Sequence, residues 1–407
     1  MLTSLQQPLW QCAFRPLFTL TTVAAFLLML GWVAFLALGW PLPPVAGGPF
    51  VWHVHELLLG FVLAAAAGFV LTSTPEFTRT PDFCRRVSAQ LVALWLLGRV
   101  AFWSSGALGW AALAVAALAQ LGFVGLLTAT ILPRLWADPD RRHMGFAWTL
   151  AAMGSCMVGF YWSALAGSAD PMRWLRALLG LVQMLIIVAL SRISMRIVNA
   201  EVDRVAAARP DEDIPPYVAR PPRRNMALLC IALFTLVQWA TPMWAPLATV
   251  SGWLALAAAA AVLALMGDWH VGRALLRRWP LLLYAVYAFM AAGYALIGLA
   301  ILSDRISTGA GTHLLTVGAI GLAIYLVMVI AGYTHSGLDK REHVWPIFGS
   351  LLIMLAALCR AWTYLTGNAT WMYAAALLWC AAFALLAWHM LPVWWSARAD
   401  GKVGCDE

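Results

Sequence analysis

Two histidines and a glutamate stand together near the start of a long apolar stretch, in the order His53-Val54-His55-Glu56. A neutral imidazole is a good ligand for copper or haem iron, and a neighbouring carboxylate can orient that imidazole or deliver protons. At about 100° per helical residue, the two histidines point about 200° apart. One metal ion therefore takes both only if the helix start unwinds. Otherwise they serve opposite faces, and Glu56 can reach the face of His53.

Two further histidines lie at the ends of a second apolar stretch. His313 opens it and is expected on the same outer side as His53 and His55, so all three could meet in one site. His335 comes 22 residues later, about 33 Å along a helix, which is the full membrane thickness. His335 belongs either to a second, cytoplasmic site or to the solvated interface.

Arg99 and Arg360 lie inside apolar stretches, and an ionisable residue within a membrane span marks a functional site by default. A carboxylate is the common partner for such an arginine, and a haem propionate would suit its planar fork. A structural ion pair or a side chain reaching the interface explains them equally well. Small residues at spacing four, from Gly60 to Thr72, would let a flat macrocycle or another helix approach the backbone.

The composition sets the elements that position these residues. Hydrophobic residues make up 63% of the 407 and charged residues only 11%, whereas a soluble domain carries about 25% charged residues. The apolar blocks mostly reach the ~20 residues that a membrane helix needs. We predict an all-α, polytopic integral membrane protein, with about twelve transmembrane helices in a single transmembrane domain. The spans are 16–40, 50–74, 88–105, 108–132, 143–166, 172–198, 225–245, 247–267, 279–303, 310–333, 344–366 and 371–395.

Most of the 26 Lys and Arg residues fall on alternate connections, beginning with Arg15 and ending with Arg398 and Lys402. Positive charge marks the cytoplasmic side, so both termini are predicted to be cytoplasmic. The net charge of +8 then reflects orientation, and no nucleic-acid partner is expected. The first apolar block is too long for a cleavable signal peptide and is expected to remain as the first helix.

The segment 199–224 is rich in arginine, proline and acidic residues and is predicted to be a charged cytoplasmic loop between two six-helix halves. Such loops are common in transporters, so a twelve-helix transporter of a metal, haem or small solute is one alternative. The seven cysteines never approach a Cys-x-x-Cys spacing. Neither a disulfide framework nor a thiolate zinc site is therefore predicted.

Several motifs together resemble the NnrS family over the whole chain. They are Phe14-Arg15-Pro16-Leu17-Phe18, Trp52-His53-Val54-His55-Glu56, Gly68-Phe69 followed by Thr72 and Pro75, the run from His313 to Gly321, and Thr334-His335-Ser336-Gly337. The likeness is specific in the predicted spans 50–74 and 310–333 and loose elsewhere. Thr334, Ile330 and the pair Glu76-Phe77 depart from the family pattern.

The resemblance implies a bacterial inner-membrane protein that contains haem and copper and is associated with denitrification and nitric oxide resistance. It carries over His53, His55, His313 and His335 as ligand candidates, and Glu56 is the candidate for proton delivery. The expected partners are membrane lipid, nitric oxide and an electron donor that the sequence does not name. Reduction of nitric oxide to nitrous oxide, other detoxification, and gas sensing without turnover all stay open as alternatives.

Overall fold

The computed structural model describes residues 7–167, 170–209, 214–339, 341, 343–402 and 404–405, and no strand occurs among them. Each of the twelve predicted spans is a helix, and most ends lie within a few residues of the prediction. Their bounds are α1 Phe14–Leu38, α2 to α3 Gly48–Thr78, α4 Arg85–Trp103, α6 Trp110–Ala137, α7 Met144–Ala166, α8 Met172–Ala208, α9 Pro221–Ala240, α10 Leu247–Met266, α11 Arg278–Ser303, α12 to α13 Thr308–Thr334, α14 Trp345–Thr366 and α15 Thr370–Trp395.

Eleven of these helices, within the described part of the chain, are long and apolar enough to cross a membrane. The other is α4, whose 19 residues include Arg85, Arg86 and Arg99. The structure confirms the predicted all-α, multi-pass membrane fold. An apolar helix suits this environment because it satisfies its backbone hydrogen bonds internally.

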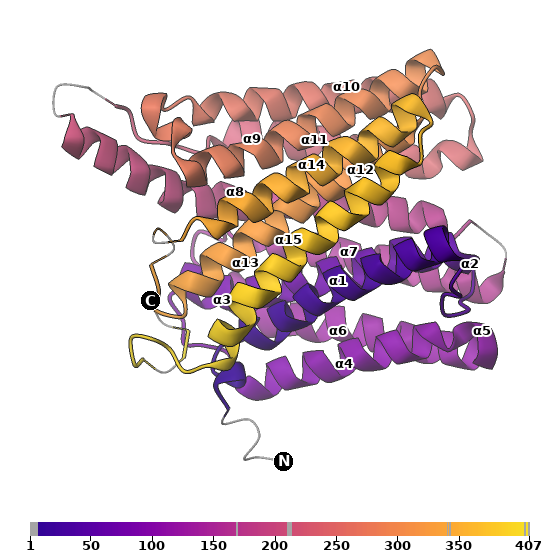
Figure 1. Cartoon of the computed structure of the whole chain (residues 1–407), viewed down its shortest axis with the longest axis horizontal. Helices are drawn as coiled ribbons and strands as arrows, with labels where there is room; N and C mark the ends of the chain where they lie inside the picture. Colours follow the sequence, from indigo (N-terminus) through magenta and orange to yellow (C-terminus); the bar gives the residue numbers. More distant parts are fainter. Residues whose placement is uncertain are drawn as a thin grey trace. The chain divides into compact units, whose positions relative to one another are not determined.

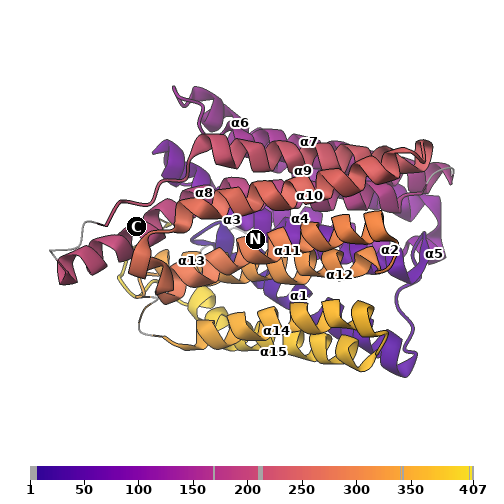
Figure 2. The ribbon, with the colours of Figure 1, turned by 90° about the horizontal axis from the view of Figure 1, so that it is seen from above.

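The chain forms two compact units, each assembled from segments distant in sequence. The first unit contains Met1–Leu178, Val327–Gly349 and Trp379–Glu407, and the second contains Leu179–Leu326 and Ser350–Leu378. Within the first unit α6 packs against both α4 and α7, and α1 packs against α3 (Figure 1). Within the second unit α10 lies between α9 and α11, and α11 also contacts α12 (Figure 2).

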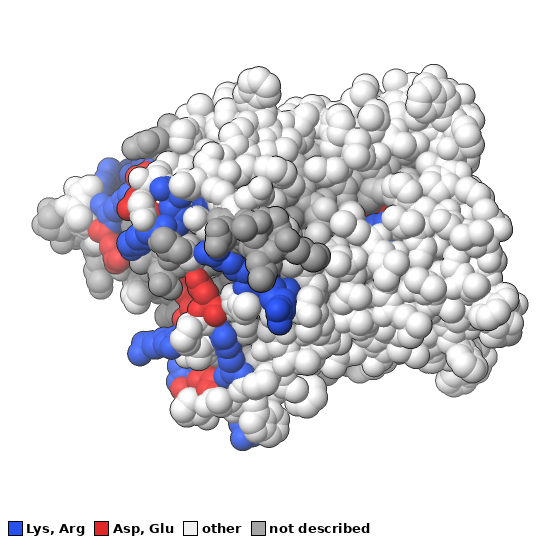
Figure 3. All heavy atoms as spheres, turned by 90° about the horizontal axis from the view of Figure 1, so that it is seen from below, with Lys and Arg blue, Asp and Glu red and all other residues white. Residues whose placement is uncertain are grey.

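The connections of the first unit meet at two opposite ends of its helices. At one end, Arg134 at the end of α6 donates to Thr80 Oγ1 at 3.0 Å, and the backbone N–H of Cys405 donates to Asp82 at 2.7 Å. At the other end, the N–H of Gly106 donates to the carbonyl of Pro44 at 2.7 Å. Most of the Lys and Arg atoms visible in Figure 3 gather toward one side of the view, beside a largely uncharged surface. In this unit, the arginine-rich and the arginine-poor connections predicted from the sequence therefore lie at opposite ends of the helices.

The segment predicted as a loop at 199–224 is partly helical. Helix α8 continues to Ala208, and α9 begins at Pro221. Asn199 binds the backbone of Tyr217 twice, donating to its carbonyl at 3.1 Å and accepting from its N–H at 2.7 Å. Arg223 pairs with Asp268 at 2.7 Å, where the side chain of Asp268 is 2% exposed. These contacts hold the described part of the connection against the second unit, whereas 210–213 lie outside the described residues.

The small residues of α3 form a helix-packing face. A Cβ placed on Gly68 would lie 2.8 Å from the ring of Phe18 and 3.3 Å from Cβ of Leu17, both on α1. At Gly60, a Cβ would lie 3.0 Å from Arg99 and 3.4 Å from Leu28. The sequence left open whether a helix or a flat macrocycle approaches these small residues. At Gly68 the neighbour is helix α1.

We expect Gly68→Val to destabilise the protein by about 1–3 kcal/mol, because an added side chain overpacks the contact with fully buried Phe18. The matched control is Gly125→Val on α6, where an added Cβ has nothing within 4 Å. The free energy of unfolding in mixed micelles measures the difference. Equal stability of the two variants would contradict this packing.

Candidate functional site

Helix α2, Gly48–His55, runs directly into a π-helical turn, η3, Glu56–Val62, and then into α3, Leu63–Thr78. Gly47 caps the start with a φ of +90°, a value that favours glycine, and Pro49 stands in the first turn. π-turns inside α-helices are rare and frequent at functional sites. The helix that carries His55 and Glu56 therefore changes its winding between these two residues.

His55, Glu56 and Arg99 form a buried charged group in the first unit. The side chains of His55 and Glu56 are fully buried, and that of Arg99 is 6% exposed. Glu56 Oε1 accepts hydrogen bonds from His55 Nδ1 at 2.9 Å and Arg99 Nη1 at 3.0 Å. The carboxylate partner expected for Arg99 is therefore Glu56, supplied by a helix that precedes it in the sequence.

Tyr161 on α7 completes this group, which we call the His55 cluster: His55, Glu56, Arg99 and Tyr161. The hydroxyl of Tyr161 lies 2.9 Å from His55 Nε2. Because the carboxylate accepts at Nδ1, a neutral His55 carries its proton there and accepts the Tyr161 O–H at Nε2. This gives a directional row of exchangeable protons from Tyr161 through His55 to Glu56. The ring of Phe102 stacks on His55 at 3.6 Å between centroids.

Several polar atoms near the His55 cluster lack hydrogen-bond partners among the described residues. They are Glu56 Oε2, Arg99 Nε, Arg99 Nη2 and Gln120 Nε2. Gln120 lies beside Gly98, where an added Cβ would be 2.8 Å from its amide nitrogen. A buried polar group without a partner costs stability, so a hydrogen bond from a water or a polar ligand group to these atoms would be favourable.

His53 faces other neighbours than His55. Its ring stacks on Trp32 of α1 at 4.2 Å between centroids and 18° between planes. The two histidines thus serve different faces of one helix, as one alternative predicted. The carboxylate of Glu56, which the sequence placed within reach of the face of His53, contacts His55 and Arg99.

His313 lies in the second unit, at the end of α12, Thr308–His313, and directly before the second π-turn, η7, Leu314–Gly321. Its Nδ1 lies 2.8 Å from the carbonyl of Gly309. A carbonyl only accepts, so Nδ1 carries the proton and Nε2 keeps its lone pair. In the same unit, Arg360 donates to the hydroxyl of Tyr364 at 3.0 Å, and the Tyr364 ring lies 5.4 Å from that of His313.

His335 lies in the first unit and is 5% exposed. Its Nδ1 lies 2.8 Å from the carbonyl of Cys405, so Nε2 again keeps its lone pair. Close by, the Arg398 guanidinium hydrogen-bonds Asp400 at 2.9 and 2.7 Å and holds the pKa of that carboxyl well below its usual range. His55, His313 and His335 thus share one arrangement, in which an oxygen fixes Nδ1.

The described residues contain no group of three or more His, Cys, Asp and Glu placed to hold a metal ion. The cysteine expectation needs correction, because Cys12 and Cys405 form a disulfide across 393 residues of sequence. Spacing rules detect only pairs that are close along the chain, whereas this pair is brought together by packing of the segments before α1 and after α15.

The sequence profile of the NnrS protein family matches residues 8–398, nearly the whole chain. The chain belongs to the NnrS family. A search of curated proteins finds no match. Membership in the NnrS family places the chain among nitric-oxide-related membrane proteins, in agreement with the helices described above.

Tyr161 is the residue of this NnrS-family site that sequence reasoning missed. Tyrosines are common at membrane interfaces, so one more near the end of a predicted span carries no signal by itself. Only the packing of α7 within the first unit brings its hydroxyl to His55. The signal that existed was indirect: a buried histidine next to a glutamate needs a partner for its second ring nitrogen.

We expect Tyr161→Phe to destabilise this NnrS-family protein by about 1–3 kcal/mol, because it leaves the buried Nε2 of His55 without its donor. The control is Tyr284→Phe on α11, where the side chain is only half-buried. Unfolding free energies in mixed micelles compare the two. A loss no larger for Tyr161→Phe than for Tyr284→Phe would show that the hydroxyl does not satisfy His55.

Proposed function

We propose that this chain binds nitric oxide at a histidine-held haem in the bacterial inner membrane and detoxifies it, by reduction to nitrous oxide. The observation that carries the proposal is the His55 cluster, a fully buried imidazole hydrogen-bonded to a carboxylate that also pairs with an arginine. Ionisable groups inside a membrane are costly to maintain, which supports a functional role. Family membership supports the nitric oxide chemistry.

The donor chemistry of the first unit fits one imidazole ligand to a haem iron. His55 donates Nδ1–H to Glu56, the arrangement that orients metal-ligating histidines and raises their basicity. Its Nε2 contacts Tyr161, so a metal there would take the place of the hydroxyl. The partnerless nitrogens of Arg99 would suit a haem propionate. Haem, when bound, would supply the iron that takes the gas. A copper ion would need ligands beyond the groups described.

Reduction of nitric oxide consumes protons and electrons, and the His55 cluster offers a route for the protons. Glu56 accepts from His55 Nδ1, so its carboxylate stays available to take up and release protons while Nε2 binds a metal. Arg99 stabilises the ionised form of Glu56 between transfers. The electron donor is a separate partner.

The test is a visible absorption spectrum of the purified full chain, oxidised and dithionite-reduced, before and after nitric oxide is added. Pyridine haemochrome and metal analysis are run on the same sample. Stoichiometric haem with a nitrosyl shift is the expected result. A colourless, metal-free protein from haem-replete cells would overturn the proposal, and nitrosyl formation without nitrous oxide production would reduce it to gas sensing.

A second candidate, transport, is favoured by one observation. Two spans, Gly48–Thr78 and Thr308–Thr334, are each interrupted by a π-turn directly after a histidine, and interrupted helices mark substrate sites in many transporters. Transport predicts uptake that depends on substrate, and it predicts no stoichiometric haem. The absorption spectrum therefore separates the two functions.

A further inference from the structure

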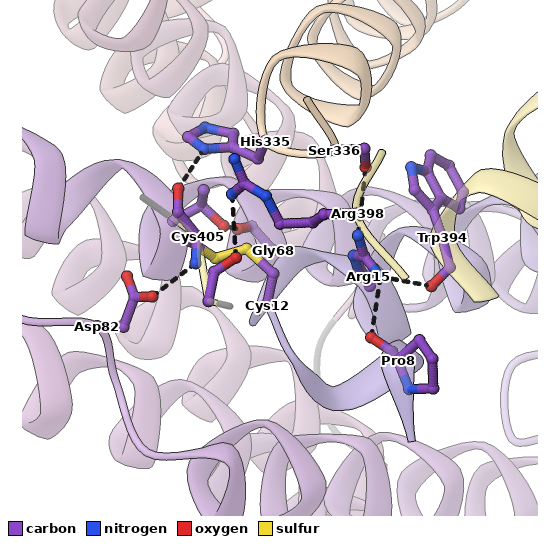
Figure 4. Close-up of a disulfide and its surroundings, with 12 residues drawn as sticks. Pro8, Cys12, Arg15, Gly68, Asp82, His335, Ser336, Trp394, Arg398 and Cys405 are labelled. Atoms are coloured by element: carbon purple, nitrogen blue, oxygen red, sulfur yellow. Dashed lines mark hydrogen bonds between the residues drawn. A yellow bond between two sulfur atoms is a disulfide. The ribbon is translucent and has the colours of Figure 1, made fainter. Parts of the chain in front are cut away.

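A disulfide joins Cys12 and Cys405, the two cysteines that are farthest apart in the described sequence. Cys12 precedes α1, Cys405 lies beyond α15, and their Cα atoms are 5.1 Å apart, within the range that disulfides span. Cys12 is 1% exposed and Cys405 is 7% exposed. Figure 4 shows the bond beside His335, Arg398 and Asp82. The disulfide therefore fastens the segment after α15 to the start of the first helix.

This disulfide lies at the end of the first unit that the charge pattern predicts to be cytoplasmic. The N–H of Cys405 donates to Asp82 at 2.7 Å, and Asp82 belongs to the connection that carries Arg79 and Arg85. Thiols in the cytosol are kept reduced, and the disulfides that do form there are usually transient, catalytic or redox-sensing. The predicted cytoplasmic location therefore favours a reversible disulfide rather than a permanent structural one.

The disulfide also holds the backbone group that fixes His335. The carbonyl of Cys405 accepts from His335 Nδ1 at 2.8 Å, and the carbonyl of Gly404 accepts from Arg398 at 3.1 Å. A little earlier in the segment, the N–H of Ala399 donates to the carbonyl of Ser336 at 3.1 Å. The described residues between Ser396 and Cys405 thus contact His335 and its neighbour Ser336, and the covalent bond at Cys405 fastens them.

We propose that Cys12 and Cys405 form a reversible thiol–disulfide site whose reaction partner is a protein dithiol, and whose reduction releases the C-terminal segment from His335. In the reaction, a thiolate of the dithiol attacks one sulfur, forms a mixed disulfide and expels the other cysteine as a thiolate, which takes up a proton. The second thiol of the reductant then breaks the mixed disulfide. Two cysteine thiols remain on the chain, and the reductant leaves as its own disulfide.

Apart from the disulfide, the segment after α15 is held by few elements of regular structure, so reduction is expected to release it. Its described residues form no helix after Trp395, and hydrogen bonds to Asp82, His335, Ser336 and Arg15 join it to the rest of the unit. A segment held only by hydrogen bonds of this kind opens locally at low free energy, whereas a disulfide keeps it closed. The inference does not depend on the nitric oxide proposal, since it needs neither haem nor turnover.

The experiment uses the full chain in nanodiscs, incubated with reduced thioredoxin as the dithiol. Maleimide mass tags count thiols, and limited trypsin digestion reports exposure of Arg398, which is 5% exposed when the segment is closed. We expect two additional tags and an increase of about tenfold in cleavage after Arg398, as for a segment freed to open locally. A bond that thioredoxin leaves intact in the folded protein would overturn the reversible site.

Variants separate release of the segment from other effects of the reductant. Cys405→Ser is expected to be cleaved at the fast rate with or without thioredoxin. Cys84→Ser, which removes an exposed free cysteine, is expected to keep the response of the natural chain. Cleavage of Cys405→Ser at the slow rate of the oxidised protein would show that the disulfide does not hold the segment closed.

Discussion

Replacing Glu56 with alanine is expected to destabilise the protein by about 3–5 kcal/mol, since removing one partner of a buried ion pair leaves the other charge uncompensated. Glu56 is fully buried and accepts from both His55 and Arg99. The variant removes the acceptor of both. The free energy of unfolding, measured by denaturant titration in mixed micelles, is the readout.

The double variant Glu56→Leu with Arg99→Leu provides the decisive control. Removing both charges replaces an uncompensated arginine with apolar contacts, so the double variant is expected to be more stable than Glu56→Ala, because buried pairs are often replaceable by hydrophobic residues. Similar losses for Arg142→Ala, whose pair with Asp140 is 67% and 59% exposed, would show that burial is not the cause. Losses of stability that simply add for single replacements at Glu56 and Arg99 would show that the two side chains do not interact.

Replacing His55 with alanine is expected to lower the haem content per protein by at least about tenfold and to abolish the nitrosyl spectrum. Loss of a residue that only orients a metal ligand already costs about 10–100-fold in affinity, and the proposal makes His55 the ligand itself. Pyridine haemochrome and the absorption spectrum with nitric oxide measure both effects. Retention of haem and nitrosyl signal would remove His55 from the site.

Two matched histidine variants accompany this measurement. His270→Ala changes an exposed histidine and should leave the haem content unchanged. His313→Ala tests the second unit, where Nε2 also keeps a lone pair because Nδ1 binds the carbonyl of Gly309. Loss of haem in His313→Ala with full haem in His55→Ala would move the proposed site from the His55 cluster to His313.

Composition and apolar periodicity were enough to predict the membrane fold and nearly all helix positions. Lipid offers no backbone hydrogen bonds, so a chain that is 63% hydrophobic has few alternatives to apolar helices. The same reasoning selected His55, Glu56 and Arg99, because ionisable residues stand out in apolar stretches. It could not anticipate the continuation of α8 to Ala208, since polar helices and polar loops have similar compositions.

Which of these groups come into contact depends on how the helices pack. Glu56 joins His55 because Arg99 reaches it from α4, and Tyr161 arrives from α7. Cys12 finds Cys405 because packing brings together positions 393 residues apart. Composition and periodicity report the environment of each residue along one helix. Contacts between helices depend on how side chains of different helices fit together, which no local pattern encodes.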